Sequence, residues 1–375
     1  MKLALYLHIP FCRRKCPYCD FYSVTHPPNE EEYLRAILTE ARLWRERLPS
    51  PVVFITFYAG GGTPSLLSPG FYARLFEQLG KIFPFQPEEL TLEANPEGLD
   101  QARLRGYLAA GFNRLSLGFQ SLLPRGLAAL GRVHSVEEAR RAYFQAREAG
   151  YRNVSLDFIF GWPGQTLSLL EKELEEVIRL GAEHLSFYEL TPEPGTPLFR
   201  RLQEGKLALP SEETLVRMHE MVRERLSSAG YEAYEISNYA RPGFRCRHNL
   251  FYWKAQPYLG LGPAAASFLH RIRLRNPEDL QGYLRALKED KLPARVEEEL
   301  SEEGAFREAV ILALRLSEGV KREEFLARFG RDPEQFFARE IRELKELGLL
   351  EVSPRGFSLS PRGRLLASQV QLKFL

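Results

Sequence analysis

Cysteine, methionine and long apolar runs are scarce in this chain of 375 residues, which contains four Cys and three Met. So few thiols argue against the disulfide framework of a small secreted domain and favour a reducing, cytoplasmic setting. No apolar run approaches the length of a membrane span. The net charge of +2 is too small to make nucleic acid or a membrane surface the main partner. We therefore expect a cytoplasmic globular protein with no specific nucleic-acid partner.

Three of the four cysteines lie together in the segment Cys12-Arg-Arg-Lys-Cys16-Pro-Tyr-Cys19. A CxxxCxxC loop can present three thiolates to three irons of a [4Fe–4S] cluster, which leaves the fourth iron without a protein ligand. That iron is then a site for a substrate or cofactor. Zinc is the main alternative, but it usually takes four ligands in paired spacing, and no second pair is present. The spacing thus favours Cys12, Cys16 and Cys19 as cluster ligands.

Short β-rich apolar runs alternate with helix-period segments up to about residue 240. The predicted strands span 3–8, 52–58, 90–93, 114–117, 154–160 and 184–189. Helical spacing of apolar residues is clearest over 31–48 and around 170–178. Six strand–helix units in a row predict an α/β fold with a parallel sheet, either open or curled into a barrel.

Glycines and polar residues follow these strands directly. In chain order, the strand ends carry the cysteine loop, Gly60-Gly61-Gly62, Glu93 with Asn95, Gln120, Asp157 with Gly161, and Glu189. In a parallel barrel all strand ends meet on one face, where such folds place their chemistry. An open sheet would use two or three strands at a switch point. Six contributing strands therefore favour a barrel.

After about residue 240 the strand–helix alternation ends and the composition of the chain changes. Residues 241–275 are aromatic and turn-rich and contain the run His248-Asn-Leu-Phe-Tyr-Trp253, and they are predicted to extend the barrel. From residue 276 the pattern is that of charged amphipathic helices, clearest over 302–316 and 333–347, followed by short strands at 350–352 and 357–359 and a last helix. This predicts three parts, 1–240, 241–275 and 276–375, the last a smaller α+β domain of winged-helix type.

The segments LHIPFCRRKCPYCDF, YAGGGTPSLL, LEANPE, NRLSLGFQSL, LDFIFGWPGQT and LTPEPGTPLF together resemble the radical S-adenosylmethionine (SAM) proteins of the coproporphyrinogen III dehydrogenase-like family. The resemblance covers almost the whole chain. It implies a partial, TIM-like (β/α)6 barrel with a HemN-type C-terminal domain. It also implies a [4Fe–4S] cluster whose open iron is chelated by SAM, from which an electron can release a 5′-deoxyadenosyl radical.

The family's site residues can be carried over by position. Gly61, Gly62 and Thr63 resemble the strand end that receives the methionine moiety, where glycine allows close backbone approach. Glu93 resembles a contact to the ribose hydroxyls, and Gln120 and Asp157 resemble further polar contacts to SAM. Tyr6 and His8 match the YxHIPFC pattern, and Tyr6 is the predicted catalytic residue. A simple turn at GGGTP and helix caps at the acidic positions are the structural alternatives.

Three features favour the heme chaperone branch of this family over its enzymes. The dehydrogenases of the family have the cysteine pattern CxxxCxxCxC. In this chain the position of the last cysteine, two residues after Cys19, is Phe21. Those enzymes carry an N-terminal extension, whereas this sequence starts about ten residues before its cysteines. The run from His248 to Trp253 is the branch's heme-binding pattern, with an imidazole ligand beside aromatic surface. An aromatic core around a hydrogen-bonded His248 is the alternative, and Ala266 replaces a histidine common in the branch.

The leading hypothesis is therefore a protein that binds heme and delivers it to acceptor proteins of the respiratory chain, with the cluster and SAM as a switch. It implies an electron donor such as a flavodoxin or ferredoxin. Peripheral membrane contact, and a monomer or a homodimer, are compatible with it. The alternative is an oxygen-independent coproporphyrinogen III dehydrogenase, so the sequence leaves open whether the protein is an enzyme. A radical enzyme acting on RNA is a third class, suggested by Arg355, Arg362 and Arg364.

Overall fold

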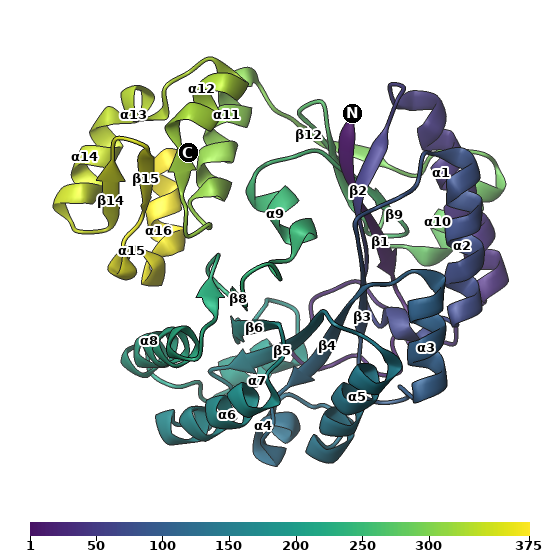
Figure 1. The fold of residues 1–375 in the computed structure, drawn as a ribbon, viewed down its shortest axis with the longest axis horizontal. Helices are drawn as coiled ribbons and strands as arrows, with labels where there is room; N and C mark the ends of the chain where they lie inside the picture. The colour runs from purple at the N-terminus through teal and green to yellow at the C-terminus, as the bar shows by residue number, and fades with distance from the viewer.

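The computed structural model describes residues 1–375, which form a curved sheet with helices on its convex side and a separate C-terminal unit (Figure 1). The six central strands are β1 (Lys2–Ile9), β2 (Val53–Gly61), β3 (Glu89–Ala94), β4 (Arg114–Gln120), β5 (Val154–Phe160) and β6 (His184–Glu189). They lie in chain order, and each neighbouring pair is parallel. The predicted strands are confirmed, and β2 and β4 continue further, to Gly61 and Gln120.

Helices connect these strands, and two more follow β6. They are α1 (Glu30–Arg47), α2 (Pro69–Ile82), α3 (Gln101–Ala110), α4 (Pro124–Ala129), α5 (Val136–Ala149), α6 (Leu167–Leu180), α7 (Pro197–Gln203) and α8 (Glu212–Ser228), with a 3-10 turn η1 over Pro64–Leu66. Local sequence sets their ends. In α5, for example, Ser135 and Glu138 form a capping box, and Gly150, at φ 112°, ends the helix in the left-handed region.

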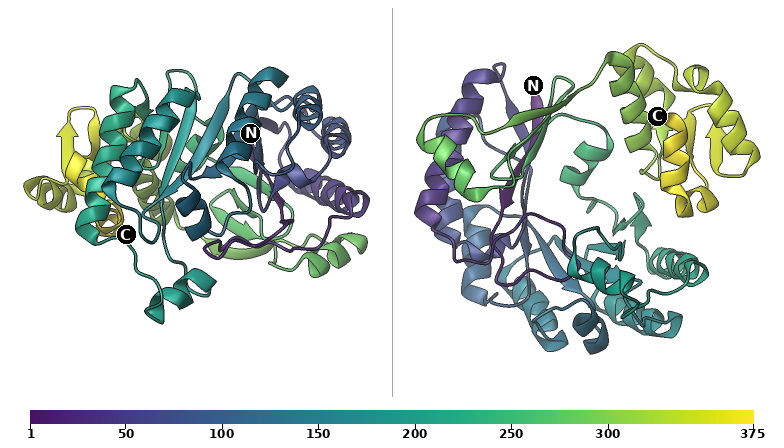
Figure 2. Two further views of the ribbon diagram at one scale, coloured as in Figure 1. Left: turned by 90° about the horizontal axis from the view of Figure 1, so that it is seen from below. Right: turned by 180° about the vertical axis from the view of Figure 1, so that it is seen from behind.

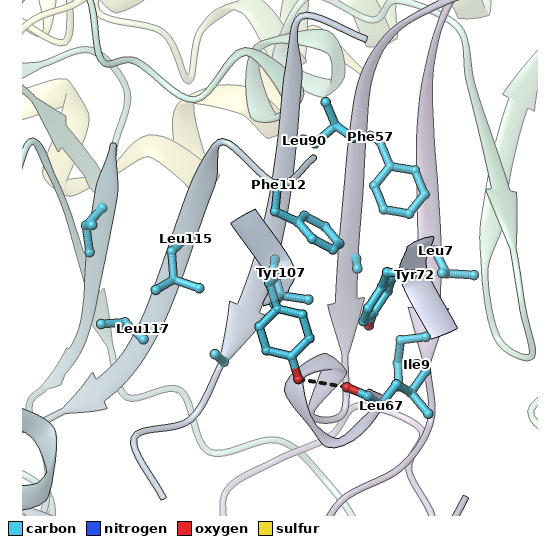
Figure 3. Close-up of a cluster of buried hydrophobic side chains, with 14 of the residues drawn as sticks. Leu7, Ile9, Phe57, Leu67, Tyr72, Leu90, Tyr107, Phe112, Leu115 and Leu117 are labelled. Atoms are coloured by element: carbon cyan, nitrogen blue, oxygen red, sulfur yellow. Dashed lines mark hydrogen bonds between the residues drawn. The ribbon is translucent and has the colours of Figure 1, made fainter. Parts of the chain in front are cut away.

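The main hydrophobic core lies between the sheet and these helices. Along β4 the side chains alternate, so that Leu115, Leu117 and Phe119 are buried on the helix side. Figure 3 shows part of this core, in which aromatic rings of α2 and α3 lie against the strands and the Tyr107 hydroxyl donates to the Leu67 carbonyl at 2.7 Å. Burial of this face fixes the register of the strands, and with it the residues that point to the other side.

The sheet continues beyond the six strands on both edges. Strands β9 (Tyr258–Leu261), β10 (Ala266–Leu269), β11 (Ile272–Arg275) and β12 (Arg295–Glu299) extend it from β1, and β8 (Asn238–Ala240) and β7 (Glu232–Ala233) extend it from β6. The two edge strands, β12 and β7, do not pair with each other, so the barrel is open. Helix α10 (Leu280–Lys288) belongs to this extension and contacts α1. The sheet therefore runs past residue 276, where the sequence suggested a boundary.

The short helix α9 (Arg247–Trp253) lies inside the curve of the sheet, on the side opposite to the outer helices (Figures 1 and 2). It contacts β2 of the barrel and α11 of the C-terminal unit. The HNLFYW run thus occupies the concave side of the barrel, while β9, β10 and β11, which lie in the same predicted range 241–275, extend its sheet.

The C-terminal unit has a hydrophobic core of its own. Its elements are α11 (Glu302–Ala313), β13 (Val320–Lys321), α12 (Arg322–Phe329), α13 (Pro333–Phe336), α14 (Ala338–Glu346), β14 (Leu350–Ser353), β15 (Gly356–Leu359), α15 (Pro361–Leu365), α16 (Ala367–Gln371) and η2 (Leu372–Phe374). Three strands in the order β13-β15-β14 and the helices around them give the expected small α+β domain. The helix predicted over 333–347 is interrupted at Phe337, whose backbone leaves the helical region while its ring packs against Phe306.

No helix of this structure combines the length and the apolar character needed to cross a membrane. This agrees with the absence of long apolar runs in the sequence.

Glu40 of α1 ties the sheet extension to the barrel. Its buried carboxylate accepts hydrogen bonds from the Gly262 N–H at 2.9 Å, the Asn276 amide at 2.7 Å and the Tyr283 hydroxyl at 2.6 Å. Burial raises the pKa of Glu40 to about 7, although these donors favour the ionised form. In weakly acidic solution, Glu40 therefore carries a proton in the native protein but has lost it in the unfolded chain.

We expect this proton to make the free energy of unfolding depend on pH. Because the pKa of Glu40 is higher in the native than in the unfolded state, the stabilisation is present below about pH 4.5 and is lost as the pH rises to about 7. The loss is on the order of 3 kcal/mol for this one group. Urea unfolding at several pH values should show a flatter pH dependence for Glu40→Gln than for wild type. The exposed Glu46→Gln on the same helix should keep the wild-type slope, and equal slopes for all three proteins would contradict the assignment.

Candidate functional site: a cavity on the concave side of the barrel

A cavity of about 450 Å³ lies on the concave side of the six strands and reaches the cysteine loop. Most of the residues predicted for the site line it, namely Cys12, Cys16, Cys19, Gly61, Gly62, Thr63, Glu93, Gln120 and Asp157. Tyr6 and His248 do not line it. The strand ends thus come together as the barrel prediction requires.

The wall of the cavity is polar because alternate residues of each strand face inward. On β4 these are Arg114, Ser116, Gly118 and Gln120, between the apolar residues that face the helices. Ser186 of β6 and Asp157 of β5 continue this inner face. A closed barrel is filled by branched apolar side chains at these positions. Here the inner face leaves space for a polar ligand.

Hydrogen bonds hold the cysteine loop at the end of β1. The Cys12 N–H donates to the Val24 carbonyl at 2.9 Å, and the Val24 N–H donates to the Pro10 carbonyl at 2.7 Å. The Thr63 hydroxyl lies 3.6 Å from the Cys12 Sγ. Burial raises the pKa of the Cys19 thiol, a change that ligation to iron would reverse, since the thiolate is the ligand.

The chemistry of the loop fits a cluster better than a zinc ion. All three of its donors are thiols, and Cys246 is the only other cysteine of the chain. One zinc ion needs converging ligands, whereas an iron–sulfur cluster takes its thiolates at different irons. The Arg132 guanidinium is 3.3 Å from the Cys16 Sγ, and hydrogen bonds to sulfur are among the features that set a cluster's potential. We infer that Cys12, Cys16 and Cys19 would hold a [4Fe–4S] cluster.

Gly61 and Gly62 bring the backbone of β2 close to this loop. Gly61 has φ 108°, and a Cβ there would lie 2.5 Å from the His8 ring. A Cβ on Gly62 would lie 2.7 Å from the Phe11 carbonyl oxygen and 3.1 Å from the Cys12 Sγ. The Gly62 N–H also donates to the Ile9 carbonyl at 2.7 Å. A larger residue at Gly61 would therefore displace the His8 ring, and one at Gly62 would push the cysteine loop away from β2.

We expect Gly62→Ala to lower both stability and iron content. The added methyl group meets two backbone carbonyls that cannot move independently, at a cost of about 2 kcal/mol, and it presses on Cys12. Gly80→Ala is the matched control, because nothing lies within 4 Å of a Cβ at that exposed position in α2 and alanine favours a helix by about 0.5–1 kcal/mol. Thermal unfolding and iron analysis after anaerobic reconstitution check both. Full iron content with an unchanged Tm in the Gly62 variant would contradict this account.

Glu93, Asp157 and Gln120 surround the middle of the cavity. The Glu93 carboxylate accepts from the Tyr58 hydroxyl at 2.8 Å and the Gly61 N–H at 3.2 Å, and burial raises its pKa to about 7. Asp157 accepts hydrogen bonds from the hydroxyls of Ser116, Ser155 and Ser186. Gln120 has φ 64°, a strained conformation for a residue other than glycine, next to an irregularity in the pairing of β4 with β5. These groups can bind hydroxyl and amino groups of a ligand.

Tyr6, the predicted catalytic residue, lies behind the wall of the cavity. Its hydroxyl is 3.2 Å from the His8 Nδ1, and the His8 Nε2 is 2.9 Å from the Tyr22 carbonyl oxygen. Burial raises the pKa of Tyr6 well above its ordinary value, so the phenol stays protonated. In this conformation Tyr6 is linked through His8 to the segment that follows the cysteine loop, and its catalytic role stays a prediction.

His248 is buried in α9 and both of its ring nitrogens are hydrogen-bonded. Its Nδ1 is 2.8 Å from the Thr56 hydroxyl of β2, and its Nε2 is 2.9 Å from the Tyr252 hydroxyl in the same helix. The Tyr58 ring lies 5.0 Å from the His248 ring, between centroids. Burial, with a contribution from Arg114, lowers the pKa of His248 to about 3, so the ring is neutral. To bind a metal it would have to give up one of these hydrogen bonds.

The start of α9 is fixed to the barrel by Glu89. This buried carboxylate accepts hydrogen bonds from the backbone N–H groups of Arg247 and His248, both at 3.0 Å. The Cys246 Sγ is 3.6 Å from the same carboxylate, far from the other three cysteines in the fold. Ala266, where the sequence lacks a histidine, starts β10 and does not line the cavity.

Sequence reasoning placed Asn95 among the polar strand ends without giving it a role, and it did not single out Arg132 and Arg114. The Arg132 guanidinium donates to the Asn95 side-chain oxygen at 2.6 Å, in addition to its contact with Cys16. Arg114 starts β4 and lines the cavity while only 2% of its surface is exposed. Asn95 stands after β3 in the run of polar strand ends, which was a usable signal. The two arginines offered none, because charged residues at such positions usually face solvent.

Comparisons with known proteins agree with this geometry. The model of the radical SAM superfamily matches residues 6–181, and the model of the HemN C-terminal domain matches residues 300–366. Heme chaperone HemW of Bacillus subtilis is 35% identical over 379 residues, covering 100% of this chain and 99% of the relative. Heme chaperone HemW of Mycobacterium tuberculosis is 38% identical over 372 residues, with 98% and 93% coverage.

A solved structure shares the whole fold. Coproporphyrinogen III oxidase (HemN) from Escherichia coli, described as a radical SAM enzyme, superposes with a TM-score of 0.85 at 24% identity, covering 100% of this chain and 90% of that one. The HemN likeness establishes the fold, including the C-terminal unit, and the sequence relatives establish the branch. With the cysteine loop, the strand-end cavity and this similarity along the full length, the chain belongs to the HemW heme chaperone family of radical SAM proteins.

Proposed function

We propose that this protein binds heme and delivers it to acceptor proteins. The observation that carries the proposal is similarity to heme chaperones along the whole chain, at 35% and 38% identity, including the α9 segment. The presence of Phe21 in place of a further cysteine supports it. The cavity then serves two ligands, SAM at the strand ends and heme at the α9 side.

At the strand ends, the side chains suit the parts of SAM. Cys12, Cys16 and Cys19 would hold the cluster, which with SAM supplies one-electron redox chemistry. Gly61, Gly62 and Thr63 leave room for the methionine end beside the loop. Glu93 accepts hydrogen bonds and so suits the ribose hydroxyls, while Gln120 and Asp157 suit the remaining polar groups. These assignments follow the family's pattern at positions that lie around one cavity.

On the α9 side, we propose His248 as the axial ligand of heme. The neutral imidazole is the form that binds iron. The bond to Thr56 joins α9 to β2, whereas the bond to Tyr252 lies within α9 and moves with the helix. A displacement of α9 would therefore release Nδ1 while Tyr252 continues to orient the ring through Nε2. In this proposal the position of α9 seen here, with His248 bonded to Thr56, is the closed form of the protein, which holds no heme.

The surface around the cysteine loop suits an acidic electron donor such as a flavodoxin or ferredoxin. Arg13, Arg14 and Lys15 are exposed beside Cys12 and Cys16. Opposite charges would guide such a donor to the cluster. Respiratory hemoproteins remain our proposed acceptors.

The second candidate is an oxygen-independent coproporphyrinogen III dehydrogenase, which the fold match to HemN favours. Heme titration separates the two. We expect the purified protein to take up one heme per chain, followed by the Soret band, and to pass it to a heme-free acceptor such as apomyoglobin. Absence of saturable uptake would refute the chaperone proposal.

A further inference from the structure

Arg114 is a buried cation without a hydrogen-bonded partner at its Nε. Its side chain lines the cavity from the first position of β4, and 2% of its surface is exposed. Its Nε is buried without a hydrogen-bond partner in the protein. A guanidinium offers five donors, so such isolation in the interior is costly.

The neighbouring groups do not neutralise this charge directly. The charge of Glu89 helps to raise the pKa of Arg114, but its carboxylate accepts hydrogen bonds from the N–H groups at the start of α9 and forms no ion pair with the guanidinium. Cys246 is close as well, and burial raises the pKa of its thiol to about 12, so it stays uncharged at neutral pH. A ligand in the cavity could therefore accept hydrogen bonds from the free donors of Arg114.

Arg114 lies at the α9 side of the cavity and away from the cysteine loop. It begins β4 and Gln120 ends it, so the two positions are separated by roughly 20 Å along the strand. Asn249 of α9 lines the same cavity and its side-chain amide has no hydrogen-bond partner in the protein. An arginine fork and a free amide make a donor set for a carboxylate.

We propose that Arg114, with Asn249, binds a carboxylate of the ligand on the α9 side of the cavity. If that ligand is heme, on which this inference rests, the carboxylate is a propionate. The planar guanidinium matches a carboxylate through two parallel hydrogen bonds, which would orient the porphyrin as well as attract it. The carboxylates of Glu93 and Asp157, which also line the cavity, disfavour a more highly charged anion such as a phosphate.

The test compares heme with its dimethyl ester, which has the same ring and iron but no carboxylates. We expect wild type to bind heme about tenfold or more tightly than the ester, as loss of a charge-assisted hydrogen bond predicts. Arg114→Met should lower the affinity for heme by a similar factor and leave the affinity for the ester unchanged. Arg147→Met is the control, because Arg147 of α5 pairs with Glu183, which directly precedes β6, and does not line the cavity.

The outcomes separate this inference from the proposed function. Equal affinity of wild type for heme and ester overturns the role of Arg114 while leaving heme carriage intact, whatever the variant does. Uptake of neither porphyrin by wild type overturns heme carriage and this assignment together. Preference for the free acid in wild type that Arg114→Met abolishes and Arg147→Met retains supports the inference.

Discussion

Replacement of Cys12 by serine is expected to abolish iron incorporation. The alkoxide of serine is a poor substitute for a thiolate, and a cluster held by three cysteines has no spare protein ligand. After anaerobic reconstitution, iron should fall from about four per chain in wild type to near zero, with loss of the brown cluster absorption. Cys16→Ser and Cys19→Ser should behave in the same way, because each thiolate would bind a different iron.

The fourth cysteine provides the matched control. Cys246 is fully buried beside Glu89 at the start of α9 and does not line the cavity, so Cys246→Ser should keep the full iron content. Equal loss of iron from all four variants would mean that the cysteine loop does not hold the cluster by itself. Zinc bound in place of iron would favour the alternative that the spacing left open.

His248→Ala is expected to lower the affinity for heme by more than tenfold, since it removes the proposed axial ligand. Two neighbours refine this prediction. Thr56→Val should raise the apparent affinity about fivefold, because the closed position of α9 loses one hydrogen bond and the open form becomes more populated. Tyr252→Phe should lower the affinity about tenfold, because the ring loses the group that orients it.

Heme titrations of the three variants, with circular dichroism to verify folding, check this set. We expect heme affinity to rise in Thr56→Val and to fall in Tyr252→Phe. These opposite changes would show that His248 is a heme ligand that must first lose its hydrogen bond to Thr56, and not a histidine that only supports the fold. If His248→Ala binds heme as wild type does, His248 is a structural residue that only holds α9 against β2. The sequence pattern would then be explained by the packing of α9 alone.

Much of the fold could be predicted because its signals are local. Each predicted strand is an apolar run with a polar or glycine-rich end. Such a pattern depends only on neighbouring residues, so it can be recognised without knowing the tertiary structure. Glu93, Gln120 and Asp157 could be placed on one face because parallel strands bring their ends together. The break at Phe337 was not predictable from spacing, since it depends on contacts of that ring in the C-terminal core.

The sequence could not predict which residues line the inner part of the cavity, away from the strand ends. The run from His248 to Trp253 indicates an aromatic element, but its position inside the curved sheet depends on Glu89, a residue distant in the chain. In the sequence, Arg114 looks like any charged residue at the start of a strand, and only the assembled sheet shows that it faces the cavity. Likewise, β12 could not be assigned to the barrel sheet, because its charged residues Arg295–Glu299 resemble solvent-exposed chain.

The central claim is that this radical SAM protein carries heme and does not decarboxylate a porphyrinogen. One anaerobic sample with reconstituted cluster, SAM and a reductant tests it, divided between a heme titration and an assay with coproporphyrinogen III. We predict saturable binding of one heme per chain and no formation of protoporphyrinogen. Protoporphyrinogen formed over many turnovers, without heme uptake, would contradict the account.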